Sequence, residues 1–307
     1  MQPFRYTLGE RLGITLLLSV VAALVVGAGL LARRHLQSGR GDRRGAFRVA
    51  TFAFVTGLLA WAVGADHVAD QKDEFGLIFM GIGYSLVVPC VLWIFYLALE
   101  PYARRVWPQT LISWTRLLGG GWNDGRVGSD ALVGATWGTL LACLFVFSLD
   151  LPRLVGLAPM APSFGPSLET LLGLRYAVAF ALGLANGSVL ITMGSMLVLI
   201  LARLAFKHVW LAGLVFAIVQ TVPRVLTSTL PTWLALPVAL LIAAGFTLLV
   251  LRYGLLAGVV GAYVTDLLLA SPALGNLSGW AAIGTVFPAA VVGSLALHAF
   301  RAASARR

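Results

Sequence analysis

Charged residues are scarce in this 307-residue chain. Asp, Glu, Lys and Arg make up 11% of it, whereas 59% of the residues are hydrophobic, and the mean hydropathy is +0.91. Soluble globular domains carry roughly 25% charged residues, so this chain could not cover a water-exposed globular surface. A soluble globular protein is therefore excluded, and the composition indicates an integral membrane protein.

Cysteines and catalytic motifs are scarce as well. The two cysteines, Cys90 and Cys143, lie inside apolar runs, and the sequence has neither a CxxC pair nor a Cys/His cluster. A disulfide framework and a zinc site are therefore not indicated. HExxH, GxSxG and a glycine-rich phosphate loop are also missing, although many hydrolases and nucleotide-binding proteins depend on them. We therefore assign no catalytic residue, no metal site and no cofactor.

Long apolar runs recur along the whole chain. A bilayer core about 30 Å thick is crossed by about 20 apolar residues in a helix. We predict one all-α integral membrane domain, 1–307, which is a polytopic transmembrane helix bundle of about nine spans. The sixth span is the weakest, because it is short and ends at Pro223; without it, one crossing fewer remains. The spans are roughly 12–32, 49–65, 76–99, 131–149, 177–202, 209–223, 232–251, 255–273 and 280–300.

Basic residues concentrate in alternate loops. Residues 32–48 alone carry six arginines and one acid, and the 22 Lys and Arg divide 16 to 6 if this loop is cytoplasmic. Because Lys and Arg in short loops set orientation, we expect the amino terminus outside and the carboxyl terminus in the cytoplasm. The Arg-Gly-Asp at 40–42 is then a chance match that no adhesion receptor reaches. Such loops predict anionic lipid as a partner, and not nucleic acid.

The connection 100–130 is the longest predicted for the cytoplasmic side. Trp107, Trp114 and two leucines recur there at helical spacing opposite Arg116, which predicts an interfacial amphipathic helix over about 107–119. That helix is either a lipid-anchored connector or a lever that passes movement to a partner. Asp130 or Ser129 is expected to cap the following span. The candidate residues for contact with a partner or lipid are Arg40, Asp42, Arg43, Arg44, Glu100, Tyr102, Arg104, Arg105, Trp107, Trp114, Arg116 and Asp130.

Two of these residues, Glu100 and Arg104, have the i, i+4 spacing of an ion pair on a helix. Pro101 lies between them and allows a hinge where the third span leaves the bilayer. Three further pairs of glycines with GxxxG spacing begin at Gly134, Gly183 and Gly254. Small residues at this spacing favour close helix packing in membranes.

Asp266 is the ionisable residue near the middle of a predicted span. A carboxylate within a membrane is costly to bury and marks a candidate functional site. We consider Asp266 a candidate intramembrane polar site for a proton or a cation. The alternative is a neutral or hydrogen-bonded carboxyl group at a helix interface, since Ser271-Pro272 follows within two turns.

Two stretches resemble a known family. "LARRHLQSGRGDRRGAFRVA" and "YLALEPYARRVWPQTLISWTRLLGGGWNDGRVGSDALVGA" are similar to the polytopic membrane region at the carboxyl end of certain bacterial serine/threonine protein kinases. The similarity is closest over about 31–135. This chain departs from the family at Asp124-Gly125, where the family has Asp-Pro, and at Ser129, where it has Arg. It also has no glycine-rich loop, His-Arg-Asp or Asp-Phe-Gly of a kinase domain.

The resemblance implies a bacterial inner-membrane protein whose kinase domain acts in cis or in trans. The first hypothesis is therefore a non-catalytic module that anchors, and also senses, for a cytoplasmic serine/threonine kinase. The short outward amino terminus fits a module whose kinase and preceding span are on another polypeptide or have been removed. The second hypothesis is a small-molecule or ion transporter or channel with Asp266 in the path. The third is a membrane-embedded lipid-modifying enzyme that uses Glu100, Asp124 and Asp130.

Overall fold

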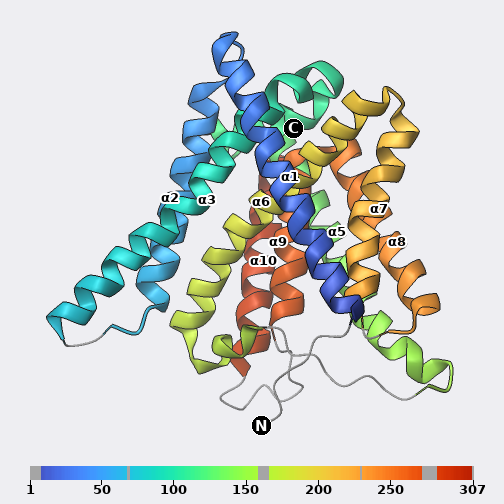
Figure 1. The fold of residues 1–307 in the computed structure, drawn as a ribbon. Helices are drawn as coiled ribbons and strands as arrows, with labels where there is room; N and C mark the ends of the chain where they lie inside the picture. Colours follow the sequence, from blue (N-terminus) through green and yellow to red (C-terminus); the bar gives the residue numbers. More distant parts are fainter. Residues whose placement is uncertain (1–7, 68–69, 158–165, 229, 272–281, 306–307) are drawn as a thin grey trace.

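The computed structural model describes residues 8–67, 70–157, 166–228, 230–271 and 282–305, and this part of the chain is helical without a β-strand (Figure 1). The predicted all-α polytopic bundle is confirmed. Its elements are α1 (Leu8–Gln37), α2 (Arg43–Gly64), α3 (Gln71–Val106), η1 (Pro108–Leu111), α4 (Ile112–Leu118), α5 (Gly125–Leu154), η2 (Pro166–Leu172), α6 (Leu174–Phe206), α7 (Val209–Thr227), α8 (Thr232–Tyr253), α9 (Leu255–Ala270) and α10 (Ile283–Ser304).

Among the described residues, eight helices are long and apolar enough to cross a membrane, and α9 is a shorter apolar helix of 16 residues. At about 1.5 Å per residue, α9 is about 24 Å long. The shortest apolar helix is therefore α9, whereas the sequence indicated that the sixth span would be the short one. That span, α7, was predicted to end at Pro223 and continues to Thr227. Pro223 lies directly before the last turn of α7, where the loss of one backbone donor interrupts little of the helix.

The long helices run in alternating directions, so the connections after α1, α3, α6 and α8 lie at one end of the bundle, and α10 ends there (Figure 1). Direct contacts join these connections. The Arg48 guanidinium donates to the Leu118 carbonyl over 2.9 Å, and Gly254 abuts the backbone of Thr110. We call this the basic end, because it contains residues 33–48 and 100–130. The last residues of α2, α5, α7 and α9 lie at the opposite end.

The most extensive helix contact is between α5 and α9. A Cβ atom added to Gly134 would lie 2.5 Å from the Ala257 carbonyl oxygen, and one added to Gly138 would lie 2.4 Å from that of Gly261. The expected close packing at this glycine pair is therefore observed. It is not observed at Gly183 and its partner four residues later, since an added Cβ would meet nothing within 4 Å at either position.

The outer surface of the bundle is apolar. On α3, Phe79 is 71% exposed and Met80 is 65% exposed, and on α1, Leu30 is 65% exposed. A soluble protein rarely exposes apolar patches of this extent. In a bilayer the same side chains contact acyl chains, so the exposed surface agrees with a multi-pass membrane protein.

Candidate functional site

The arginine-rich loop at the basic end is fixed to α3 through Asp42. The carboxylate of Asp42 caps α2 by accepting the Gly45 backbone N–H over 2.9 Å, and the Tyr96 hydroxyl donates to it over 3.4 Å. A Cβ atom at Gly45 would lie 2.5 Å from both side chains, so this approach requires glycine. The acid of the Arg-Gly-Asp stretch therefore serves the fold, and it holds the loop in place.

A second contact ties α1 to α3 where Pro101 interrupts the helical hydrogen bonds. Proline has no N–H, so the Leu97 carbonyl one turn earlier loses its usual donor. The Nδ1 of His35 lies 2.8 Å from that carbonyl oxygen and donates to it, and the Tyr102 ring packs on His35 at 4.9 Å. The helix continues past Pro101 to Val106 without a break. His35 was missed by sequence reasoning, although a proline inside a span is a signal that a donor is needed.

The predicted ion pair between Glu100 and Arg104 is present. It is asymmetric, because the Glu100 side chain is 5% exposed and that of Arg104 is 56% exposed. The Oε2 atom of Glu100 is buried and has no hydrogen-bond partner. Asp42 of the arginine-rich loop lies close enough for its charge to act on the Glu100 carboxyl group. Glu100 is therefore a structural carboxyl group beneath the arginine-rich loop, and Arg104 and the neighbouring Arg105 are exposed.

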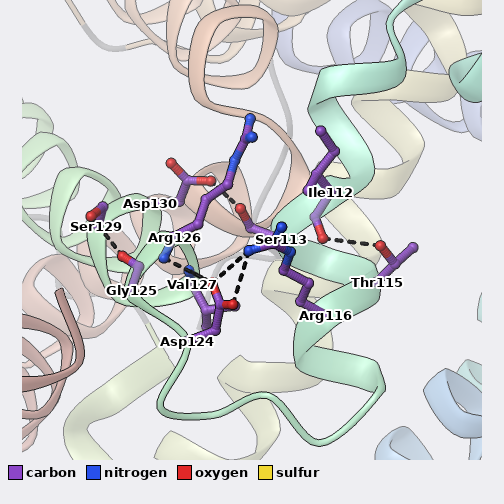
Figure 2. A network of polar contacts seen from close by, with 10 residues as sticks. All are labelled: Ile112, Ser113, Thr115, Arg116, Asp124, Gly125, Arg126, Val127, Ser129 and Asp130. Atoms are coloured by element: carbon purple, nitrogen blue, oxygen red, sulfur yellow. Dashed lines mark hydrogen bonds and ion pairs between the residues drawn. The ribbon is translucent and has the colours of Figure 1, made fainter. Parts of the chain in front are cut away.

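Asp124 organises the return from α4 into α5 (Figure 2). It caps α5 by accepting the backbone N–H groups of Arg126 over 2.8 Å and of Val127 over 3.3 Å. The Arg116 guanidinium donates to both carboxylate oxygens, over 3.0 and 2.9 Å. The hydrogen bond from Arg126 and then that from Arg116 lower the pKa of Asp124 below its usual value. Three glycines follow Leu118, the last residue of α4, and Gly120 has a φ of +92°.

The helix cap expected at Asp130 or Ser129 is a wrong prediction. The span begins earlier, at Gly125, so Asp130 lies inside α5. Its carboxylate accepts the hydroxyl of Ser113 on α4 instead (Figure 2). Ser113 is buried, so this bond joins α4 to α5 inside the protein. Asp124 and Asp130 thus belong to one polar network at the basic end.

The helix expected over 107–119 is divided into a 3₁₀ turn, Pro108–Leu111, and the short α4. Its proposed lipid anchor Trp114 is 4% exposed and belongs to the hydrophobic core, as does Leu111. Trp107 is partly buried and packs against the same core. The apolar face meets protein because this segment contacts α2, α5 and α9. Residues 107–118 therefore form a packed part of the bundle.

The exposed charge at the basic end is positive. Its acids, Asp42, Glu100, Asp124 and Asp130, are all engaged in the internal contacts described above. Arg43, Arg44 and Arg48 line a shallow depression of about 300 Å³ together with Phe47, whose side chain is 67% exposed. The exposed arginines of the basic end are Arg33, Arg34, Arg40, Arg43, Arg44, Arg48, Arg104, Arg105, Arg116, Arg252 and Arg301.

A larger cavity of about 450 Å³ lies at the opposite end, between α5, α7, α8 and α9. Asp266 and Arg224 both line it, and the charge of Arg224 acts on the Asp266 carboxylate. Arg224 is in the last turn of α7 and donates to the Gln220 carbonyl oxygen over 2.5 Å. The sequence indicated Asp266, but the span predicted over 209–223 left Arg224 just outside it, whereas α7 includes Arg224. We call this the Asp266 cavity.

Two polar contacts of the loop residues Asp66 and His67 also mark the opposite end. Asp66 accepts the Tyr176 hydroxyl over 2.6 Å and pairs with Arg175, and the Tyr176 bond and the Arg175 charge lower the pKa of Asp66. His67 contacts Glu74 over 2.6 Å, and this hydrogen bond raises the pKa of His67.

Comparison of the chain with protein families, with curated proteins and with solved structures finds no match. Within the described residues, no group of three or more His, Cys, Asp or Glu could hold a metal ion. The candidate sites are therefore the basic end and the Asp266 cavity, as their geometry defines them.

Proposed function

We propose that this chain is the non-catalytic membrane module of a bacterial serine/threonine kinase signalling system. It anchors the kinase, in cis or in trans, at the cytoplasmic face of the inner membrane, with its own carboxyl terminus on that side. The observation that carries the proposal is the basic end, where arginines are exposed and the acids are engaged internally. A surface of one charge sign attracts partners of the opposite sign.

Anionic lipid is the first such partner. The depression lined by Arg43, Arg44 and Arg48 offers cations to headgroup phosphates, and the exposed Phe47 offers an apolar contact beside them. Each Lys or Arg near an anionic bilayer surface contributes about 1 kcal/mol of attraction. This attraction favours the basic end on the cytoplasmic side.

The kinase is the second partner. The family resemblance is closest over residues 31–135, and these residues build the arginine-rich loop, α2, α3, the 107–118 segment and the start of α5. The resemblance therefore covers the elements that display the positive charge. Because the 107–118 segment is packed on α2, α5 and α9, a shift of these helices in the membrane also moves this segment. This coupling supports a sensing role in addition to anchoring.

The test replaces Arg40, Arg43 and Arg44 by Glu in the full chain. A matched control replaces Lys72 and Arg153, which are exposed at the opposite end, by Glu. Each protein is tagged at the carboxyl terminus and purified from source membranes in mild detergent, and co-purified kinase activity is measured with labelled ATP and mass spectrometry. Wild type and control should retain a serine/threonine kinase that the triple variant loses.

A kinase absent from the wild-type preparation, or equally abundant with the triple variant, would contradict the proposal. The sidedness is measured separately in right-side-out and inverted vesicles, with Ser38→Cys and a membrane-impermeant thiol reagent in a background without Cys90 and Cys143. Labelling only in inverted vesicles is expected. Labelling in right-side-out vesicles would show that the arginine-rich loop faces outside.

The Asp266 cavity favours a second function, transport of a small molecule or ion with Asp266 in the path. An intramembrane carboxylate that lines a cavity is a frequent feature of such pathways. Asp266→Asn should then abolish a flux measured in proteoliposomes while the protein still elutes as a folded species. Flux of the same size in the variant would remove this second function.

A further inference from the structure

The Asp266 cavity has the construction of a binding site for a small amphiphile. Its volume of about 450 Å³ falls in the range of about 300–1,000 Å³ that is common for ligand pockets. Phe145, Val238 and Ile242 contribute apolar walls, and Asp266 and Arg224 contribute the two charges. Mostly apolar walls with a few convergent polar groups are typical of small-molecule sites.

The fold places the two charges on separate helices. Asp266 comes from the last turns of α9, and its neighbour Thr265 fixes that stretch to α5 by donating to the Gly138 carbonyl over 3.0 Å. Arg224 comes from the last turn of α7, where its guanidinium also contacts the Gln220 side chain over 3.3 Å. Within the described residues the Asp266 carboxylate has no hydrogen-bond partner, and the charge of Arg224 acts on it.

Charge balance selects the ligand class. Asp266 and Arg224 carry opposite charges that act on each other, so a cation alone or an anion alone would disturb this balance. Uncompensated charge is costly near the bilayer core. A molecule with an ammonium group and an anionic group leaves the cavity neutral and contacts both residues.

We infer that the Asp266 cavity binds a zwitterionic amphiphile, with its ammonium group against Asp266, its phosphate or carboxylate against Arg224 and its apolar part against the α5 and α8 walls. This site is at the opposite end from the basic surface, so it does not depend on the kinase association proposed above. The same chemistry exists in the headgroup of phosphatidylethanolamine and in soluble zwitterions.

The test measures binding to the purified full chain. Glycerophosphoethanolamine is titrated into protein in detergent by calorimetry, and phosphatidylethanolamine bound in lipid nanodiscs is compared with phosphatidylglycerol by native mass spectrometry. Asp266→Asn and Arg224→Gln should each weaken binding by about tenfold or more, since each removes a charged contact. Asp150→Asn and Arg153→Gln are the matched controls, because both residues are exposed at the same end without lining the cavity.

Binding of the soluble probe would show that the headgroup suffices, and binding of the lipid alone would show that acyl chains are also needed; both support the inference. Phosphatidylglycerol bound as well as phosphatidylethanolamine would overturn it, as would unchanged binding in Arg224→Gln. Arg224 is exposed, so this variant keeps the test valid if Asp266→Asn fails to fold. Binding of neither probe to wild type would also overturn it.

Discussion

The contact between α5 and α9 gives the sharpest quantitative prediction. In Gly138→Ala the new methyl carbon would lie 2.4 Å from the Gly261 carbonyl oxygen and 3.0 Å from Cβ of Val264, whereas ordinary contacts begin at 3.4 Å. The two helices must therefore separate locally by about 1 Å. A separation of 0.5–1 Å forfeits roughly a quarter to a half of the dispersion energy of each contact, and overpacking typically destabilises by about 1–3 kcal/mol.

The matched control is Gly187→Ala in α6, where an added Cβ meets nothing within 4 Å. Both substitutions replace a glycine in a helix and share a propensity gain of up to about 1 kcal/mol, so their difference isolates the packing. We expect Gly138→Ala to be less stable than Gly187→Ala by about 1–3 kcal/mol. The assay is reversible unfolding in mixed micelles, followed by circular dichroism. Equal stability of the two variants would refute the close packing of α5 on α9.

Two further predictions concern the ends of the bundle. His35→Ala should destabilise the protein by about 1 kcal/mol, because the Leu97 carbonyl loses its donor. Adding Pro101→Ala should restore this stability in the double variant, because the alanine supplies a backbone N–H. The same unfolding assay in micelles measures both variants, and additive losses of stability would contradict the prediction. The Glu74 hydrogen bond raises the pKa of His67 above 6.5. The contact between His67 and Glu74 therefore stabilises the folded protein fully below that pH, and this stabilisation is lost as the pH rises through the pKa of His67 in the folded state. An NMR titration of the His67 imidazole in wild type and in Glu74→Gln tests this, and identical titrations would contradict it.

The helices and their alternation follow from the sequence because each depends on local composition. Apolar runs of bilayer length predict spans, and Glu100 with Arg104 predicts an ion pair because residues four apart share a helix face. Arginine-rich loops separated by an even number of crossings must meet at one end, and Arg48 does contact Leu118 in the next such connection. These inferences need no knowledge of how distant helices pack.

The remaining features depend on packing between segments far apart in the sequence. Asp124 and Asp130 are both acceptable helix caps by residue type, and the choice between them depends on Arg116 and Ser113 of the preceding segment. Trp114 has the pattern of a lipid anchor, but the segment is covered by other helices. Arg224 lies in the last turn of α7, and nothing local shows that α9 will bring Asp266 to it.

The short α9 joins the two candidate sites. Its first residue follows Gly254, where an added Cβ would lie 2.4 Å from the Thr110 carbonyl oxygen, and its last turns carry Asp266 into the cavity. Between these points α9 is mostly buried, and it packs closely on α5. A packed helix moves as a unit, because cores resist continuous deformation. Any displacement of α9 at the cavity must therefore be accommodated by the 107–118 segment at the basic end. Spin labels at exposed Gln109 and Thr136 should report a distance change when the zwitterionic probe binds, and no change in Asp266→Asn.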